Sequence, residues 1–269
     1  MAWKNALSIE TAITCQRMMS MLNDAERNRY GRQIRLFGEE GQEKLKRTSV
    51  FIAGAGGLGS IVSIYMAAAG FGRICIADCD SVELSNLNRQ VLHRTKDLGR
   101  YKADSARDTL RGINPEVVVE TMVETIKEET IDRLLQDCDL IMDAMDNFPT
   151  RYLLNKAAMA RKIPLFHGAI SGLQGQATTI IPGKTACLRC IFPRAPPDAA
   201  FPALGSTCGI IGSIQVTEAV KYTLGLGELL QNRLLLWDGL NACLDEVACL
   251  PNPGCPDCAE LWSKTRNGQ

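Results

Sequence analysis

The chain carries a glycine-rich segment with the spacing of a phosphate-binding loop. It is GAGGLGS at residues 54–60, and its glycines are Gly54, Gly56, Gly57 and Gly59. An apolar run precedes the loop and an apolar helical pattern follows it, so we predict a strand, a tight turn and a helix. Glycines let the backbone approach a pyrophosphate closely, and a helix N-terminus offers free N–H groups to the anion. The segment therefore predicts a nucleotide site for either ATP or a dinucleotide.

An acidic residue follows the glycines at a distance that suits a ribose ligand. Asp78 ends the strand-like run RICIAD, about 20 positions beyond the loop, where a carboxylate can accept hydrogen bonds from ribose hydroxyls. The same glycine pattern also fits a strand-to-helix turn that is packed closely for structural reasons. The choice among NAD, FAD and ATP therefore depends on other residues.

Two C-x2-C pairs are spaced as metal ligands. CLRC contributes Cys187 and Cys190, and CPDC contributes Cys255 and Cys258. A closed tetrahedral zinc site needs four thiolates at about 2.3 Å from the metal, and the sequence holds no other C-x2-C unit. A redox disulfide is the alternative, but it suits a single pair on a strand-to-helix turn better than two pairs that each follow a Pro-Gly turn. We therefore predict a structural Zn2+ that ties the C-terminal tail to the middle of the chain.

The segments that must position these residues alternate between strand and helix patterns in the first half of the chain. Helical patterns lie at residues 23–46, 58–70, 102–115, 127–136 and 150–162, and strand patterns at 50–53, 73–78, 117–122, 138–147 and 163–170. Further strand patterns at 175–183, 233–240 and 245–250 surround an amphipathic helix at 211–225. These patterns predict an α/β, Rossmann-like parallel sheet with helices on both faces, extended by antiparallel strands in the C-terminal half.

Length and composition indicate an ordinary globular protein. The chain has 269 residues, of which 46% are hydrophobic and 22% are charged. We expect an N-terminal arm at residues 1–22, either mobile or packed on the domain, and a single domain at 23–269. Lys plus Arg and Asp plus Glu both number 30, so no basic excess favours nucleic acid or a membrane surface. Because neither a signal peptide nor a membrane-spanning run is recognisable, we expect a cytoplasmic location.

Four further motifs accompany the glycine loop and the cysteine pairs. They are RYGRQ at 29–33, DCDSVELSNLNRQ at 78–90, GRYKAD at 99–104 and DAMDNFPTR at 143–151. Together these motifs resemble the MoeB/ThiF/HesA family of ubiquitin-activating-enzyme-like adenylyltransferases, most closely its HesA-type branch. The resemblance covers nearly the whole chain, from Arg29 to Cys258, and the motifs occur in the family's order.

The resemblance implies a reaction and its partners. ATP with Mg2+ would adenylate the C-terminal glycine carboxylate of a small ubiquitin-like (β-grasp) sulfur-carrier protein that ends in Gly-Gly. Pyrophosphate would be released, and the activated carrier would serve sulfur transfer for molybdopterin, thiamine or a related cofactor. The resemblance also implies a homodimer and a sulfur donor such as a cysteine desulfurase or a rhodanese.

The same resemblance assigns roles to individual residues. Arg32 would reach the ATP of the neighbouring subunit, and Asp146 would bind Mg2+. The other nucleotide-binding side chains would be the ribose ligand Asp78, the phosphate ligands Asn86, Arg89 and Lys102, and the further contacts Asp80 and Asn147.

The reaction itself requires residues of these types. A carboxylate that attacks the α-phosphate of ATP brings two anions together, so the site must supply cations to the transition state and to the leaving pyrophosphate. Arg32, Arg89 and Lys102 can do so, and Asp146 follows a buried strand where a hard carboxylate can hold Mg2+. Each residue alone fits an exposed charge or a helix cap, but their joint placement at the ends of successive strands favours a site.

The sequence gives less support for a covalent step, in which a cysteine of the enzyme would attack the acyl adenylate. Some family members use a cysteine in the loop after the first C-x2-C pair, and the corresponding segment 191–213 contains only Cys208. A helix N-terminus could lower the pKa of this thiol and make it a nucleophile, but an inert buried thiol fits the same position. The two histidines, His93 and His167, have no partner at the spacing of a triad or a metal pair, so we expect structural roles for both.

Three alternative functions fit parts of the pattern. A tRNA-modifying dehydratase of the same superfamily would share the adenylation chemistry, but the zero net charge and the paired cysteines do not favour it. A NAD- or FAD-dependent oxidoreductase would use the glycine loop and Asp78 but would have no use for Arg89, Lys102 and Asp146. A nucleotide-binding adaptor without activity would not need an intact set of charged residues.

Overall fold

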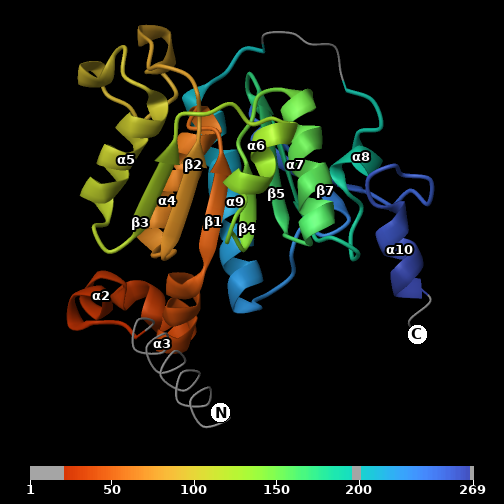
Figure 1. Ribbon diagram of the computed structural model, residues 1–269, viewed down its shortest axis with the longest axis horizontal. Coiled ribbons are helices and arrows are strands. Elements are labelled where there is room, and N and C mark those ends of the chain that lie inside the picture. Colours follow the sequence, from red (N-terminus) through yellow and green to blue (C-terminus); the bar gives the residue numbers. More distant parts are fainter. Residues whose placement is uncertain (1–20, 196–200, 267–269) are drawn as a thin grey trace, which may run out of the picture.

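The computed structural model describes residues 21–195 and 201–266. The predicted N-terminal arm therefore lies outside the described residues, except for its last two positions. The described strands form one eight-stranded sheet in the order β3-β2-β1-β4-β5-β6-β7-β8 (Figure 1).

The first five strands of the sheet are parallel. They are β1 (Ser49–Ala53), β2 (Arg73–Ala77), β3 (Val118–Met122), β4 (Leu140–Asp143) and β5 (Leu165–Ser171). Parallel neighbours bring the carboxyl ends of their strands to one edge of the sheet, and that edge is where α/β proteins bind ligands. This half confirms the predicted Rossmann-like sheet.

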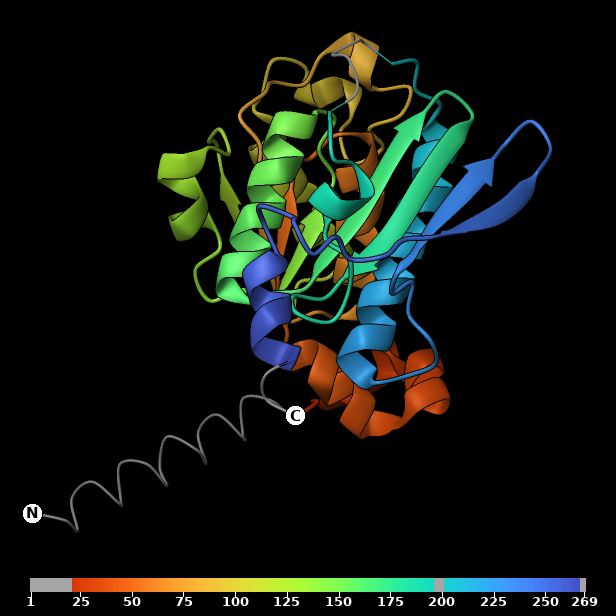
Figure 2. The ribbon, with the colours of Figure 1, turned by 90° about the vertical axis from the view of Figure 1, so that its right-hand side faces the viewer.

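The remaining three strands are antiparallel and extend the sheet on the β5 side. They are β6 (Gln174–Ile180), β7 (Arg233–Asp238) and β8 (Cys243–Ala248). The β7–β8 hairpin projects from the body of the molecule (Figure 2). The predicted antiparallel extension is therefore confirmed.

Helices cover both faces of the sheet. The helices in the described part of the chain are α2 (Asp24–Arg29), α3 (Gly31–Arg47), α4 (Gly57–Ala69), α5 (Lys102–Ile113), α6 (Glu128–Leu134), α7 (Phe148–Arg161), α8 (Leu188–Ile191), α9 (Gly205–Leu224) and α10 (Ala259–Arg266). Side chains alternate between the faces of a strand, so Phe51 of β1 packs in the cluster of α6 and α7, whereas Val50 and Ile52 pack in the cluster of α4, α5 and α9. None of the described helices combines the length and apolar character needed to cross a membrane.

Local sequence explains most helix boundaries, but not where α9 begins. Gly70, in the left-handed region at φ 85°, ends α4, and the Asn147 side chain caps α7 by accepting the Thr150 N–H at 2.9 Å. Helix α9 begins at Gly205, earlier than the predicted Ile211. Its first turn therefore includes Cys208, which agrees with the expected place of that residue at a helix N-terminus.

Candidate functional site

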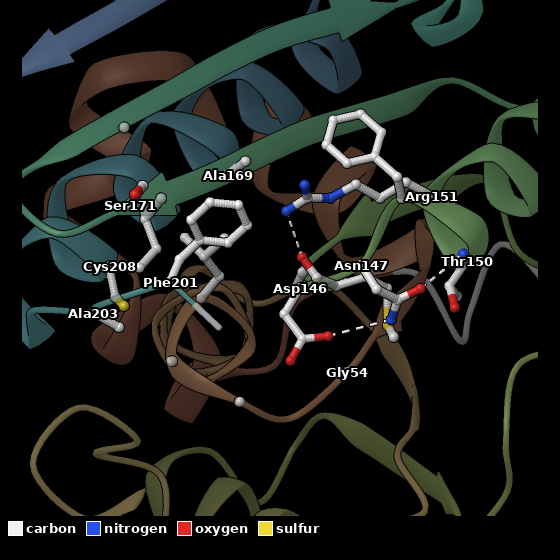
Figure 3. A pocket seen from close by; sticks show the side chains of 18 of the residues that line it. Gly54, Asp146, Asn147, Thr150, Arg151, Ala169, Ser171, Phe201, Ala203 and Cys208 are labelled. Carbon is white, nitrogen blue, oxygen red and sulfur yellow. Dashed lines mark hydrogen bonds between the residues drawn. The ribbon is translucent and has the colours of Figure 1, made fainter. Parts of the chain in front are cut away.

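A pocket of about 1270 Å³ opens at the carboxyl edge of the parallel strands. Its walls come from the loops after β1, β2, β3 and β4, from β5, β6, β7 and β8, and from the first turn of α9 (Figure 3). Loops that follow parallel strands thus form one half of the pocket, and the antiparallel extension forms the other. The glycine loop and the antiparallel strands consequently share a single cavity.

The glycine loop has the conformation that its residues predict. Gly54 adopts φ +96°, which side chains rarely allow, and its N–H donates to the Ala77 carbonyl at 3.0 Å. A Cβ on Gly59 would lie 2.0 Å from the Gly54 carbonyl oxygen, so α4 starts in direct contact with the loop. Gly54, Gly56 and Gly57 line the pocket, and Gly59 contributes by close packing. The loop presents the N-terminus of α4 to the cavity.

Asp78 fixes the loop as well as facing the pocket. Its carboxylate accepts the Ala55 N–H at 2.8 Å and the Asp80 N–H at 2.9 Å. Lys102, at the start of α5, is only 6% exposed, and its Nζ lies 2.8 Å from the Asp80 carboxylate. Since Asp80 is 64% exposed, the ammonium is fixed by a partner that still faces solvent. The structure therefore brings Asp78, Asp80 and Lys102 together beside the glycines.

The two predicted phosphate ligands after β2 differ in placement. Arg89 lines the pocket, with its Nη1 donating to the Ser85 carbonyl at 3.0 Å and to Asn88 Oδ1 at 3.1 Å. Asn86 is buried, and its side chain accepts the Glu83 N–H at 3.1 Å within the short 3-10 helix Leu84–Asn86. It is not among the described residues that line the pocket. In this structure Asn86 shapes the loop that carries Arg89.

The predicted Mg2+ ligand lies on the loop between β4 and α7. Asp146 is exposed on the pocket wall, and its Oδ1 accepts the Asn147 side-chain amide at 3.2 Å. Asn147 also lines the pocket while it caps α7. An exposed carboxylate with free lone pairs fits a hard cation, which binds through oxygen and retains several waters. Figure 3 shows the Asn147 amide between the Asp146 carboxylate and Thr150.

Arg151 is a pocket residue that our sequence analysis did not single out. Its Nη2 donates to the Met145 carbonyl at 2.6 Å (Figure 3). Its Nε lies 3.7 Å from the Asp143 carboxylate. The guanidinium also lies 5.2 Å from the centre of the Phe148 ring. Arg151 is the last residue of the motif DAMDNFPTR, which also contains Asp146. Its place in that motif was the signal by which the sequence could have identified it. It ties the Asp146 loop to the first turns of α7.

A buried polar chain runs beneath this loop. Asp143 and His167 are fully buried register partners on β4 and β5, with Asp143 Oδ2 and His167 Nδ1 2.7 Å apart. His167 Nε2 lies 3.2 Å from Nε2 of Gln176, which lines the pocket. Burial lowers the pKa of His167, although Asp143 opposes the shift. Burial also lowers the pKa of His93, which contacts the Ala55 carbonyl at 2.9 Å.

Arg32 lies far from this pocket. It is exposed near the start of α3, and the side chain of its neighbour Gln33 donates to the Ala69 carbonyl at the C-terminal end of α4. Helices α2 and α3 lie at the amino edge of the sheet (Figure 1), whereas the pocket opens at the carboxyl edge. Arg32 therefore has no access to the pocket of its own chain.

Cys208 lines the pocket as a buried thiol. It is 1% exposed, and its Sγ lies against Gly57, where an added Cβ would come within 2.7 Å of the sulfur. Burial raises the pKa of Cys208, and the nearby Arg89 charge only partly offsets that effect. The helix N-terminus is thus present as expected, but the net shift is opposite to the one that would activate a nucleophile. The geometry favours the inert interpretation.

The half of the pocket away from the glycines, called here the apolar half, carries apolar side chains beside a few polar ones, which are Ser171, Gln174, Gln176, Asp238 and Asp245. Its wall includes the small residues Ala169 and Ala203, together with the larger side chains of Ile170, Phe192, Phe201 and Trp237. Small side chains line part of the wall, leaving room for an extended segment that carries no bulky groups. This half leads directly to the Asp146 loop, so an extended ligand could bring one end to the nucleotide half.

The four cysteines of the C-x2-C pairs converge on one point. All four Sγ atoms lie within 4.8 Å of one another, with separations of 3.8 Å for Cys187–Cys190, 3.5 Å for Cys187–Cys255 and 3.4 Å for Cys190–Cys258. A tetrahedral site with Zn–S bonds of about 2.3 Å places its sulfurs about 3.8 Å apart. Burial raises the pKa of the Cys187 thiol to about 12, so a thiolate there requires a cation. The residues fit a metal ion.

A side chain of α7 joins the two cysteine pairs. Asn155 accepts the Leu188 N–H at 2.8 Å and donates to Asp257 Oδ2 at 2.8 Å. Asn155 is fully buried, and no sequence motif had marked it. The cysteine cluster is thereby fixed to the helix that begins at the Asp146 loop.

Comparison with known proteins agrees with the resemblance that the sequence motifs show. The model of the ThiF family matches residues 30–257. The SAMP-activating enzyme E1 of Haloferax volcanii is 42% identical to this chain, and the match covers 90% of this chain and 93% of that protein. The sulfur carrier protein adenylyltransferase of Thermus thermophilus is 43% identical, with coverage of 87% and 92%. The adenylyltransferase and sulfurtransferase MOCS3 of Culex quinquefasciatus is 42% identical, but the match covers only 58% of its length and 87% of this chain.

Solved structures support the fold. Crystal structures of E. coli MccB, one with MccA-N7isoASN and one with ATP, give TM-scores of 0.78 and 0.76 at 22% and 24% identity. Each match covers 89% of this chain and 76% of the MccB chain. At that identity the likeness concerns the fold alone.

Proposed function

The chain belongs to the ThiF family, and from that membership we propose that it uses ATP to adenylate the C-terminal glycine carboxylate of a small ubiquitin-like sulfur-carrier protein. The observation that carries the proposal is the single cavity in which the glycine loop, two cations and an exposed aspartate meet the apolar half of the pocket. The 42–43% identity to two relatives named for sulfur-carrier or SAMP activation supports the substrate class.

The proposed reaction forms one bond and breaks another. An oxygen of the carrier carboxylate attacks the α-phosphorus of ATP, and the bond from that phosphorus to the bridging oxygen breaks, releasing pyrophosphate. Lys102 and Arg89 supply positive charge beside the glycine loop, where the phosphates would lie. Asp146, with Asn147 beside it, would hold Mg2+, which neutralises charge on the phosphates. The carrier tail would lie in the apolar half of the pocket.

Arg32 and dimerisation are a separate part of the proposal. Because Arg32 is exposed at the edge of the sheet opposite its own pocket, a contact with ATP requires a second copy of the chain. We propose that Arg32 acts on the ATP of a partner subunit in a homodimer. The four-cysteine cluster would hold a structural Zn2+, since four protein thiolates leave no open position for catalysis.

We further propose that the chemistry of this chain ends at the adenylate. Cys208 is a buried, neutral thiol packed against the glycine loop, and this does not favour an acyl transfer to sulfur. Sulfur would then come from a separate donor, such as a cysteine desulfurase or a rhodanese. An oxidoreductase is not favoured, because Lys102 and Arg89 have no role in hydride transfer.

ATP–pyrophosphate exchange tests the proposal directly. Purified protein is assayed with and without small carrier proteins that end in Gly-Gly, and we expect exchange only when a carrier is present. Asp146→Ala should abolish exchange, whereas Asp132→Ala, which removes an exposed carboxylate on α6 paired with Arg161, should leave it intact. ATP binding without exchange for any carrier would indicate a different carboxylate substrate. Failure to bind ATP would refute the assignment.

A further inference from the structure

Gln176 connects the apolar half of the pocket to the buried chain beneath the Asp146 loop. It lies on β6, paired with Ala169 of β5 on one side and Leu236 of β7 on the other, and its side chain lines the pocket. Its Nε2 contacts His167, and no hydrogen bond to its carbonyl oxygen is found among the described residues. The amide thus has one end engaged and one end available to a ligand.

The direction of the hydrogen bonds determines which end of the Gln176 side-chain amide contacts His167. A carboxylate oxygen can only accept, so the 2.7 Å contact with Asp143 places the His167 proton on Nδ1. His167 is kept neutral by burial, which leaves Nε2 as an acceptor. The 3.2 Å contact therefore requires Gln176 to donate from its NH2 group. The Gln176 carbonyl oxygen consequently remains as an unused acceptor.

Asp143 links the hydrogen bond between His167 and Gln176 to the Asp146 loop. Its Oδ1 accepts the Met145 N–H at 3.1 Å, while Arg151 holds the Met145 carbonyl at 2.6 Å and lies 3.7 Å from Asp143 Oδ2. Met145 immediately precedes Asp146. The orientation of Gln176 and the position of the Asp146 loop thus depend on the same buried carboxylate.

We propose that Gln176 is a positioning residue whose carbonyl oxygen accepts a backbone N–H from the C-terminal Gly-Gly of the carrier. The inference rests on the proposed function and extends it. Glycine offers no side chain, so a site that selects a Gly-Gly end must recognise backbone groups and exclude larger residues. A peptide N–H is the donor available near such an end, whereas the terminal carboxylate offers only acceptors and would be repelled by the Gln176 oxygen.

The test removes first the donor and then the acceptor of the proposed hydrogen bond between the carrier backbone N–H and the Gln176 carbonyl oxygen. A carrier that supports exchange by the wild-type enzyme is prepared by peptide ligation with sarcosine, which lacks the N–H, in place of the last or the penultimate glycine. One of these carriers should raise the wild-type KM for the carrier about five- to tenfold, the loss expected for one hydrogen bond. Gln176→Leu should show a similar rise with the normal carrier and no further rise with sarcosine. Its KM for ATP should stay within about twofold of wild type.

Matched variants separate this role from a structural one. Gln174→Leu alters the same face of β6 without touching His167, and it should retain the sarcosine penalty. Gln176→Met, of similar shape, replaces Gln176→Leu if the latter unfolds. The same sarcosine penalty in wild type and in the Gln176 variant would overturn this inference alone, as would parallel changes in KM for ATP and carrier. Absence of exchange by wild type with every unmodified carrier would overturn the proposed function as well.

Discussion

Replacing Gly59 by alanine should disable the nucleotide loop while leaving the helix intact. The added Cβ would lie 2.0 Å from the Gly54 carbonyl oxygen and 2.8 Å from its carbonyl carbon, and both are backbone atoms. Real Cβ contacts essentially never fall below 3.0 Å, so α4 and the loop must separate by about 1 Å. The change therefore acts on the conformation of the phosphate-binding backbone rather than on any charged group.

The magnitude follows from two opposing effects. Overpacking costs about 1–3 kcal/mol, while alanine in a helix is favoured over glycine by about 1 kcal/mol. We expect a net destabilisation of about 0–2 kcal/mol, and Tm should fall by about 2–4 °C for each kcal/mol of that loss. A displacement of about 1 Å at a reacting site can lower activity about a hundredfold, so activity should fall far more than stability.

Gly209→Ala is the matched control, because Gly209 lies within α9 and an added Cβ there would meet nothing within 4 Å. Thermal unfolding and calorimetric titration with Mg-ATP are measured for wild type and both variants. Gly209→Ala should equal or exceed the wild-type Tm and bind ATP normally. Normal ATP affinity and exchange in Gly59→Ala would refute the argument that this close contact sets the loop conformation.

Three further perturbations have defined outcomes. Lys102→Met should lower kcat/KM for adenylation about a hundredfold, because it removes a positive charge beside the glycine loop. Lys96→Met, at an exposed position between the same two strands β2 and β3, should leave kcat/KM unchanged. Equal effects of the two substitutions would refute the role assigned to the Lys102 charge. Cys190→Ser should reduce bound zinc, measured by elemental analysis, and lower Tm, and a variant with full zinc and unchanged Tm would contradict the metal assignment. Because burial lowers the folded-state pKa of His93, the unfolded chain binds more protons below about pH 6.5, so unfolding free energy should fall as pH drops through that value. His93→Gln should flatten this pH dependence in urea titrations, and an unchanged slope would show that His93 does not cause it.

The sequence by itself determined the sheet, the glycine loop and the pairing of the two C-x2-C units in one cluster. Strand and helix patterns depend on local periodicity, and a glycine turn such as Gly54 depends on backbone freedom at one position, so both are legible along the chain. The C-x2-C pairs could be assigned to one site because each pair is a local unit and a closed tetrahedral site needs two of them. Lys102 and Asp146 line the same pocket, because Asp146 follows β4 and Lys102 begins α5 in the connection after β2.

Only the tertiary structure decided which side chains face the pocket and in which protonation state. Asn86 was expected at the phosphates but is buried in its own turn, and Arg151 entered the pocket although its motif had been noted only for other residues. The buried chain from Asp143 through His167 to Gln176 depends on strand register across β4, β5 and β6, which no sequence spacing records. Burial then set the pKa directions of His167 and Cys208. Desolvation and side-chain direction arise from contacts between distant segments, so they become defined only when the sheet and helices pack.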